Sequence, residues 1–71
     1  MQITLRQLRY FQALATERHF ARAAERVAVS QPALSGQIAA LEEALGGPLV
    51  QRGQPGLPLT PLGRAVLARA E

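Results

Sequence analysis

Apolar residues near the N-terminus recur at helical spacing. They fall on one face of a helix that begins at Leu5 and ends near Thr16 or Glu17. The residues of this face are Leu5, Leu8, Phe11, Leu14 and Ala15. Thr4 stands directly before the pattern, where its hydroxyl can accept a hydrogen bond from a free amide of the first turn. The pattern therefore predicts an amphipathic helix whose apolar face, with Phe11, covers the core.

Two further helices are predicted to meet at a tight corner. The first runs from about Phe20 to Val27, and the second begins after the N-cap Ser30, with a proline in its first turn. The second helix carries a narrow apolar stripe, formed by Leu34, Ile38, Leu41 and Leu45. Only three residues separate the two helices, and Ala28 takes the turn position where glycine is common. Helices joined so closely cross steeply, which is the helix-turn-helix arrangement.

The remainder of the chain alternates stop signals with short apolar runs. Gly46, Gly47 and Pro48 end the helix, with glycine suited to a left-handed cap. The runs 49–52 and 57–59 flank a Gly/Pro turn and predict a small β-hairpin with Leu57 and Leu59 pointing inward, although Pro58 limits its strand to an edge. Thr60 and Pro61 open a last helix whose pattern is cut short at Glu71. The predicted fold is mainly α: a three-helix core, a β-hairpin wing and the start of a fourth helix.

Composition narrows the class of protein. Seventy-one residues suit one small domain, and the absence of cysteine excludes a disulfide framework or a thiolate zinc site. All eight basic residues are arginine and the net charge is +3, which is compatible with nucleic-acid binding but also with solubility alone. No apolar run approaches the roughly 18 residues of a membrane span, and no secretory core is present, so we expect a cytoplasmic protein that binds no membrane.

The sequence lacks the residue combinations that common catalytic sites need. There is one histidine, His19, and neither cysteine nor aspartate, so a Ser/His/Asp arrangement is impossible and a zinc site lacks ligands. Glu42 and Glu43 are adjacent on a helix, point in different directions and are interpreted as a solvated face. His19 is interpreted as an exposed loop or capping residue. We therefore expect no enzyme activity, no cofactor and no metal.

Three segments carry a resemblance to a known family. The stretches LRQLRYFQALA, HFARAAERVAVSQPALSGQIAALEEALGGPLVQR and LTPLGRAVL closely resemble the N-terminal DNA-binding domain of LysR-type transcriptional regulators. The resemblance implies a winged helix-turn-helix domain over 1–60, with the helix-turn-helix at about 20–39 and the wing at about 48–60, followed by a truncated linker helix over 61–71. It also implies a homodimer through that fourth helix on a palindromic promoter site. An effector-binding C-terminal domain, through which members bind a small molecule, is absent from the 71 residues.

By position, the resemblance makes the third helix the recognition helix. Its expected DNA-binding residues are Ser30, Gln31, Pro32, Ala33, Ser35 and Gly36. Gln31 can hydrogen-bond an adenine edge bidentately, while Pro32 and Ala33 suit a thymine methyl. Ser35 can bond a base or a phosphate, and Ser30 with the helix N-terminus offers donors to the backbone. Gly36 allows a close approach to the groove wall, or is simply tolerated there.

Two arginines outside that helix have both a functional and a structural interpretation. Arg52 matches the arginine of the family's wing, expected near the minor groove or the DNA backbone; the lesser alternative is a surface ion pair. Arg22 could position the DNA backbone or be an ordinary exposed arginine.

The sequence also departs from the family pattern. Members usually have an arginine at Gly36, a serine at His19 and basic residues in the wing, where residues 53–59 have none. These departures leave an alternative open, a winged-helix protein-interaction or dimerisation module with weak or lost DNA specificity. A stand-alone winged domain of the molybdate-regulator type is a nearer alternative.

Overall fold

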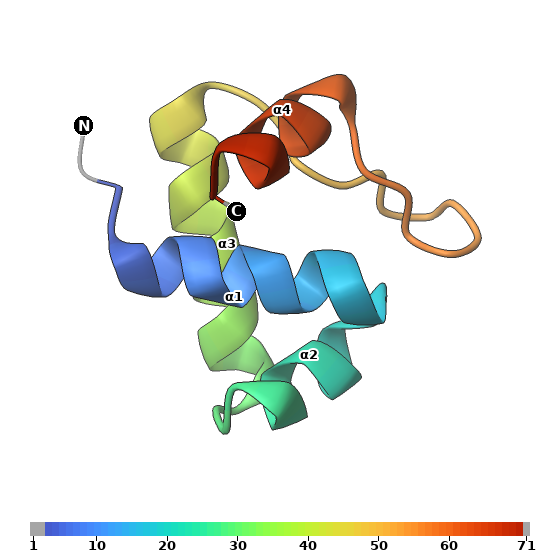
Figure 1. Cartoon of the computed structure of the whole chain (residues 1–71). Helices are drawn as coiled ribbons and strands as arrows, with labels where there is room; N and C mark the ends of the chain where they lie inside the picture. The colour runs from blue at the N-terminus through green and yellow to red at the C-terminus, as the bar shows by residue number, and fades with distance from the viewer. Residues whose placement is uncertain (1–2, 71) are drawn as a thin grey trace.

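Four helices make up the part of the chain that the computed structural model describes, residues 3–70. They are α1 (Leu5–Glu17), α2 (Phe20–Arg26), α3 (Gln31–Leu45) and α4 (Pro61–Ala70). Helix α1 crosses α3 and contacts all three other helices, with α2 beside the N-terminal part of α3 (Figure 1). The predicted end of the last helix at Glu71 lies outside the described residues, as do residues 1 and 2. None of the four helices is long and apolar enough to cross a membrane.

The residue directly before a helix caps its first turn through its side chain, as the sequence predicts. The Thr4 hydroxyl accepts a hydrogen bond from the Gln7 amide at 3.0 Å, and the Gln7 side-chain oxygen accepts one from the Thr4 amide at 3.0 Å. This reciprocal pair is a capping box, which satisfies two backbone donors at once. The Ser30 hydroxyl accepts from the Ala33 amide at 3.2 Å and begins α3 in the same way. Both predicted N-caps are therefore confirmed.

The corner between α2 and α3 closes by backbone hydrogen bonds. The Ala28 amide donates to the Glu25 carbonyl at 3.1 Å, and the Val29 amide donates to the Ala24 carbonyl at 3.0 Å. This pair of bonds is the Schellman motif, which places its central residue in the left-handed region. Ala28 has a φ of 60°, so the prediction of a glycine-like turn position is confirmed.

The core lies where α1 crosses the helix-turn-helix. Its fully buried large side chains are Phe11, Leu14, Leu34, Ile38, Leu41 and Leu49. Each side chain of this size contributes about 1.5–3 kcal/mol when it leaves water. The predicted burial of Phe11 and of three members of the α3 stripe is confirmed, whereas Leu45 remains partly exposed. Ala23 and Ala24 are also buried, and their small side chains let α2 approach its neighbours.

The residues between α3 and α4, which we call the α3–α4 loop (46–60), reach out from the helical body (Figure 1). The predicted β-hairpin is not confirmed: the loop holds one antiparallel bridge, between Val50 and Leu59, and residues 3–70 contain no longer strand. Leu57 has a φ of 45°, which is left-handed and not extended, and Pro58 has no amide hydrogen to donate. These two residues stop the pairing after one step. Leu59 is buried and Leu57 is partly buried against the core, as predicted, but Leu57 does not lie in an extended strand.

Helix α4 begins against the start of this loop. The Thr60 hydroxyl accepts from the Gly63 amide at 2.9 Å, which confirms Thr60 as the N-cap, and donates to the Pro48 carbonyl at 2.7 Å. The Thr60 amide donates to the Leu49 carbonyl at 3.0 Å. One threonine thus fixes both the first turn of α4 and the base of the loop.

Candidate nucleic-acid interface

The first two turns of α3 present mostly small, exposed residues. Five of the predicted DNA-binding residues here are exposed and one, Ser35, is partly buried; the exposed ones are Ser30, Gln31, Pro32, Ala33 and Gly36. A Cβ atom added to Gly36 would meet no atom within 4 Å, so this position faces open space. The apolar stripe of α3 is buried on the side opposite Pro32 and Gly36, so these two residues stay accessible.

A hollow of about 370 Å³ lies beside that face. The end of α1, the start of α2, the first residue of α3 and the tip of the α3–α4 loop line it; the residues are Arg18, His19, Phe20, Ala21, Gln31, Gln54, Gly56 and Leu57. Gln31 is the one predicted site residue among them. The hollow therefore joins three segments that are far apart in sequence into one concave surface.

The structure brings residues to this surface that the sequence did not point to. Arg18 caps α1 with a left-handed φ of 54°, and Gln54 reaches the hollow from the loop tip. Neither residue belongs to a helical pattern, so no periodic signal could have identified them. His19 caps α2, with its Nδ1 accepting from the Arg22 amide at 3.3 Å, which confirms the capping interpretation. The Arg22 side chain is exposed at the start of the same helix.

Arg52 lies near the middle of the loop and has two partners on other elements. Its Nη1 lies 3.2 Å from Oε1 of Glu42 on α3, and its Cζ lies 5.4 Å from the ring centroid of Phe20 on α2. The surface ion pair considered for Arg52 is thus present. The interpretation of Glu42 as part of a solvated face is wrong, because the side chain is only 13% exposed and also accepts a hydrogen bond from the Leu49 amide. Glu43 is exposed as expected.

Other arginines differ in how far their charge is neutralised. Arg26 pairs with Glu17 at 2.9 Å, which joins α2 to the end of α1. Arg18 donates to the Ala15 carbonyl at 3.3 Å and keeps its full charge, since a carbonyl is neutral. Near the hollow, Arg18 and Arg22 therefore provide positive charge without an ion pair to any described residue. No group of three His, Cys, Asp or Glu side chains that could hold a metal ion occurs among residues 3–70.

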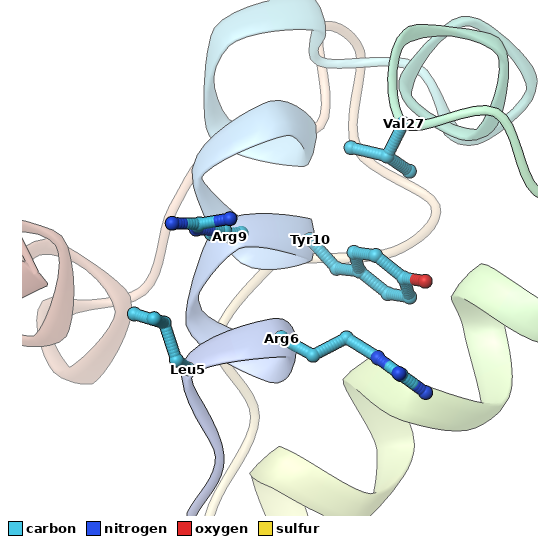
Figure 2. A pocket seen from close by; sticks show the side chains of 5 residues that line it. All are labelled: Leu5, Arg6, Arg9, Tyr10 and Val27. Atoms are coloured by element: carbon cyan, nitrogen blue, oxygen red, sulfur yellow. The ribbon is translucent and has the colours of Figure 1, made fainter.

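A second hollow, of about 360 Å³, lies on α1 beside the α2–α3 corner. Leu5, Arg6, Arg9, Tyr10 and Val27 line it. Figure 2 shows Arg6 and Tyr10 extending to one side of α1, with Leu5 and Arg9 on the other. It contains none of the predicted site residues, so the surface at the start of α3 remains the candidate interface.

The chain belongs to the family described as bacterial regulatory helix-turn-helix proteins of the lysR family, whose model matches residues 5–64. Among its relatives, the SDS degradation transcriptional activation protein of a Pseudomonas species is 59% identical over 66 residues, which are 93% of this chain and 22% of that protein. The HTH-type transcriptional regulator BudR of Klebsiella aerogenes is 56% identical over 61 residues, 86% of this chain and 43% of BudR. The chain thus spans less than half of either relative.

Solved structures agree with this assignment. The BenM DNA-binding domain in its complex with benA site 1 DNA superposes with a TM-score of 0.91 at 43% identity, over 96% of this chain and 76% of that one. Vibrio fischeri DarR, solved in complex with DNA, gives a TM-score of 0.94 at 37% identity, over 99% of this chain and 24% of DarR. The helix-turn-helix fold is therefore shared, and the relatives are transcriptional regulators, a family that is not enzymatic in kind.

Proposed function

We propose that this chain is the sequence-specific DNA-binding domain of a LysR-type transcriptional regulator, with α3 entering the major groove. The observation that carries the proposal is the exposed, small-residue face at the start of α3, beside a concave surface that a DNA backbone can follow. The DNA complexes of BenM and DarR, which share the fold, support it.

Base recognition is assigned to α3. Gln31 offers a bidentate donor and acceptor to adenine, and Pro32 and Ala33 offer apolar contact to thymine methyls. Ser35 is partly buried on the side of α3 that also carries Gln31, so its hydroxyl reaches a base or phosphate only at the edge of the reading face. Gly36 contributes no side chain and lets the backbone approach the groove wall.

Backbone contacts are assigned to the surroundings of α3. Ser30 and the N-terminal amides of α3 offer hydrogen-bond donors to a phosphate, at the positive end of the helix dipole. The exposed Arg22 and Arg18 add full positive charges. In this proposal the α3–α4 loop acts as the wing without a hairpin, and Arg52 reaches the DNA backbone or minor groove. The domain then extends over 1–60, and 61–71 begin the linker helix.

Pairing of two copies through α4 completes the proposal. An apolar groove of about 230 Å³ is lined by Ile3, Leu8, Leu45, Val66, Arg69 and Ala70. Ile3 is 40% exposed there, and a large exposed apolar residue beside α4 suits a second copy. A homodimer would read two half-sites spaced by helical turns of a palindrome in the cytoplasm. A small-molecule effector would act through a further C-terminal domain of the whole protein.

The test is a titration followed by fluorescence anisotropy. A duplex selected by the chain from a randomised 30-bp library is compared with a scrambled duplex of equal composition. We expect at least about a tenfold preference for the selected duplex. Gln31→Ala should reduce binding to the selected duplex by about 1–3 kcal/mol and leave the scrambled one nearly unchanged. Gln37→Ala, the same change elsewhere on α3, is the control. Equal affinity for both duplexes would instead favour the protein-interaction module.

A further inference from the structure

The carboxylate of Glu42 connects α3 to two points of the α3–α4 loop. Its Oε2 accepts a hydrogen bond from the Leu49 amide at 2.8 Å. Both oxygens accept from Nη1 of Arg52, at 3.2 Å for Oε1 and 3.4 Å for Oε2. Since the Glu42 side chain is only 13% exposed, this carboxylate is a fixed and largely covered anchor for the loop.

Phe20 of α2 is the second neighbour of the Arg52 guanidinium. The Arg52 Cζ lies 5.4 Å from the centroid of the Phe20 ring, within the range of a cation–π contact. Phe20 also lines the hollow between α2, α3 and the loop tip. The guanidinium is therefore held at the border of the candidate interface by one residue of α3 and one of α2.

Part of the Arg52 guanidinium is still available. Its side chain is 49% exposed, and Nη1 is the one guanidinium nitrogen bonded to residues of the described chain. An arginine has five N–H donors on three nitrogens, so Nε and Nη2 keep theirs for another acceptor. A phosphate accepts such a pair of parallel donors readily.

We propose that Glu42 is a positioning residue for DNA binding, which together with Phe20 orients Arg52 so that its free N–H groups meet a DNA phosphate. This proposal rests on the proposed function. The physical reason is preorganisation: an arginine already held in one rotamer loses less freedom when it binds. In this proposal Glu42 acts through Arg52 and not by a contact of its own with DNA, since its carboxylate bonds to the Leu49 amide and to Arg52.

The experiment is a double-mutant cycle on the selected duplex. Glu42→Gln keeps the size of the side chain and an acceptor for the Leu49 amide but removes the charge that holds Arg52. We expect it to weaken binding by about three- to tenfold. In an Arg52→Ala background the same substitution should change Kd by less than about twofold, because its effect acts through Arg52. Glu43→Gln, the same change at the exposed neighbour, is the control and should leave Kd unaltered.

A second measurement tests the positioning without DNA. In the wild type, NMR relaxation should show an ordered Arg52 Nε–H group, and Glu42→Gln should make it mobile. An equally mobile group in both forms would overturn the proposal. So would an equal loss of affinity with and without Arg52, which marks a purely structural role. A gain of affinity in Glu42→Gln would overturn it too, because Glu42 would then only neutralise Arg52.

These outcomes are separable from failure of the proposed function. A wild-type chain without preference for the selected duplex overturns the proposed function and this proposal with it. A wild-type chain that shows the preference, with an unchanged Kd in Glu42→Gln, overturns the role of Glu42 alone.

Discussion

Gly63 packs directly against the backbone carbonyl of Leu49. A Cβ atom at residue 63 would overlap the Leu49 oxygen, and Gly63 is buried. Glycine is thus required here by a close approach of α4 to the α3–α4 loop, although its backbone is helical. The neighbouring Thr60 amide bonds the same carbonyl, so the loop cannot move away without loss of that hydrogen bond.

Gly63→Ala should therefore destabilise the domain. The backbone of α4 or of the loop has to shift, at a cost of about 1–3 kcal/mol in the free energy of unfolding. Urea denaturation followed by circular dichroism measures it. The matched control is Gly36→Ala, also in a helix but facing open space, which should gain up to about 1 kcal/mol. If neither variant loses stability, the close packing at Gly63 is contradicted.

Ala28→Gly should stabilise the domain. Ala28 holds a left-handed φ of 60° in the corner between α2 and α3, where glycine has no steric penalty. Glycine has more conformational freedom to lose on folding, and this entropic cost offsets part of the relieved strain. The expected net gain in the free energy of unfolding is about 0.5–1 kcal/mol. Ala40→Gly, at an exposed helical position, should have the opposite sign and lose about 1 kcal/mol. The measurement is again urea denaturation followed by circular dichroism. A fall of the unfolding midpoint in both variants would exclude strain at Ala28.

Gly36→Arg should strengthen DNA binding. The position is open, so the new side chain can extend toward a phosphate or base without displacing α3. One added phosphate contact should steepen the slope of log K against log salt by about 0.9. Gly36→Ala serves as the comparison, because it stabilises the helix to a similar degree without adding charge. Equal Kd and equal slope for the two variants would show that residue 36 lies away from the DNA.

Arg22→Ala should weaken binding to all duplexes alike. The exposed Arg22 at the start of α2 is assigned to a phosphate, which carries no sequence information. The affinities for the selected and the scrambled duplex should fall by the same factor, and the salt slope by about 1. Arg9→Ala, an exposed arginine in the separate hollow on α1, is the control. An unchanged slope in Arg22→Ala would remove Arg22 from the interface.

Ile3→Glu should reduce self-association. Ile3 is 40% exposed in the apolar groove beside α4, where a buried charge would oppose a second copy. Sedimentation velocity over a concentration series should show the dissociation constant of the dimer rising at least about tenfold, the equivalent of 1.4 kcal/mol. Ala40→Glu adds the same charge on α3 and should have no such effect. If the two variants associate as the wild type does, the groove is not the dimer contact.

Features that depend on neighbours in sequence were predictable. Thr4, Ser30 and Thr60 each cap a helix through an amide three residues ahead, so the signal is contained in a short window. The burial of Phe11 and Leu34 follows from helical periodicity in the same way. The four helices and the left-handed corner were therefore accessible without a structure.

Features that depend on the path of the α3–α4 loop were not predictable from the sequence. Glu42 and Arg52 are ten residues apart, and their contact needs the loop to return to the last turns of α3. The β-hairpin prediction failed because apolar alternation does not report the left-handed Leu57. Gln31 was predicted to contact a base, but its meeting with Gln54 in one hollow depends on that same path.

The backbone of Leu49 is bonded both to the reading helix α3 and to helix α4. Its amide is held by Glu42 of α3, and its carbonyl is held by Thr60 and packed on Gly63 of α4, while its side chain is fully buried. Within residues 3–70, α1 contacts both α3 and α4. A displacement of α4 therefore reaches the reading helix through the backbone of Leu49, together with the Thr60–Pro48 hydrogen bond and the packing of both helices on α1.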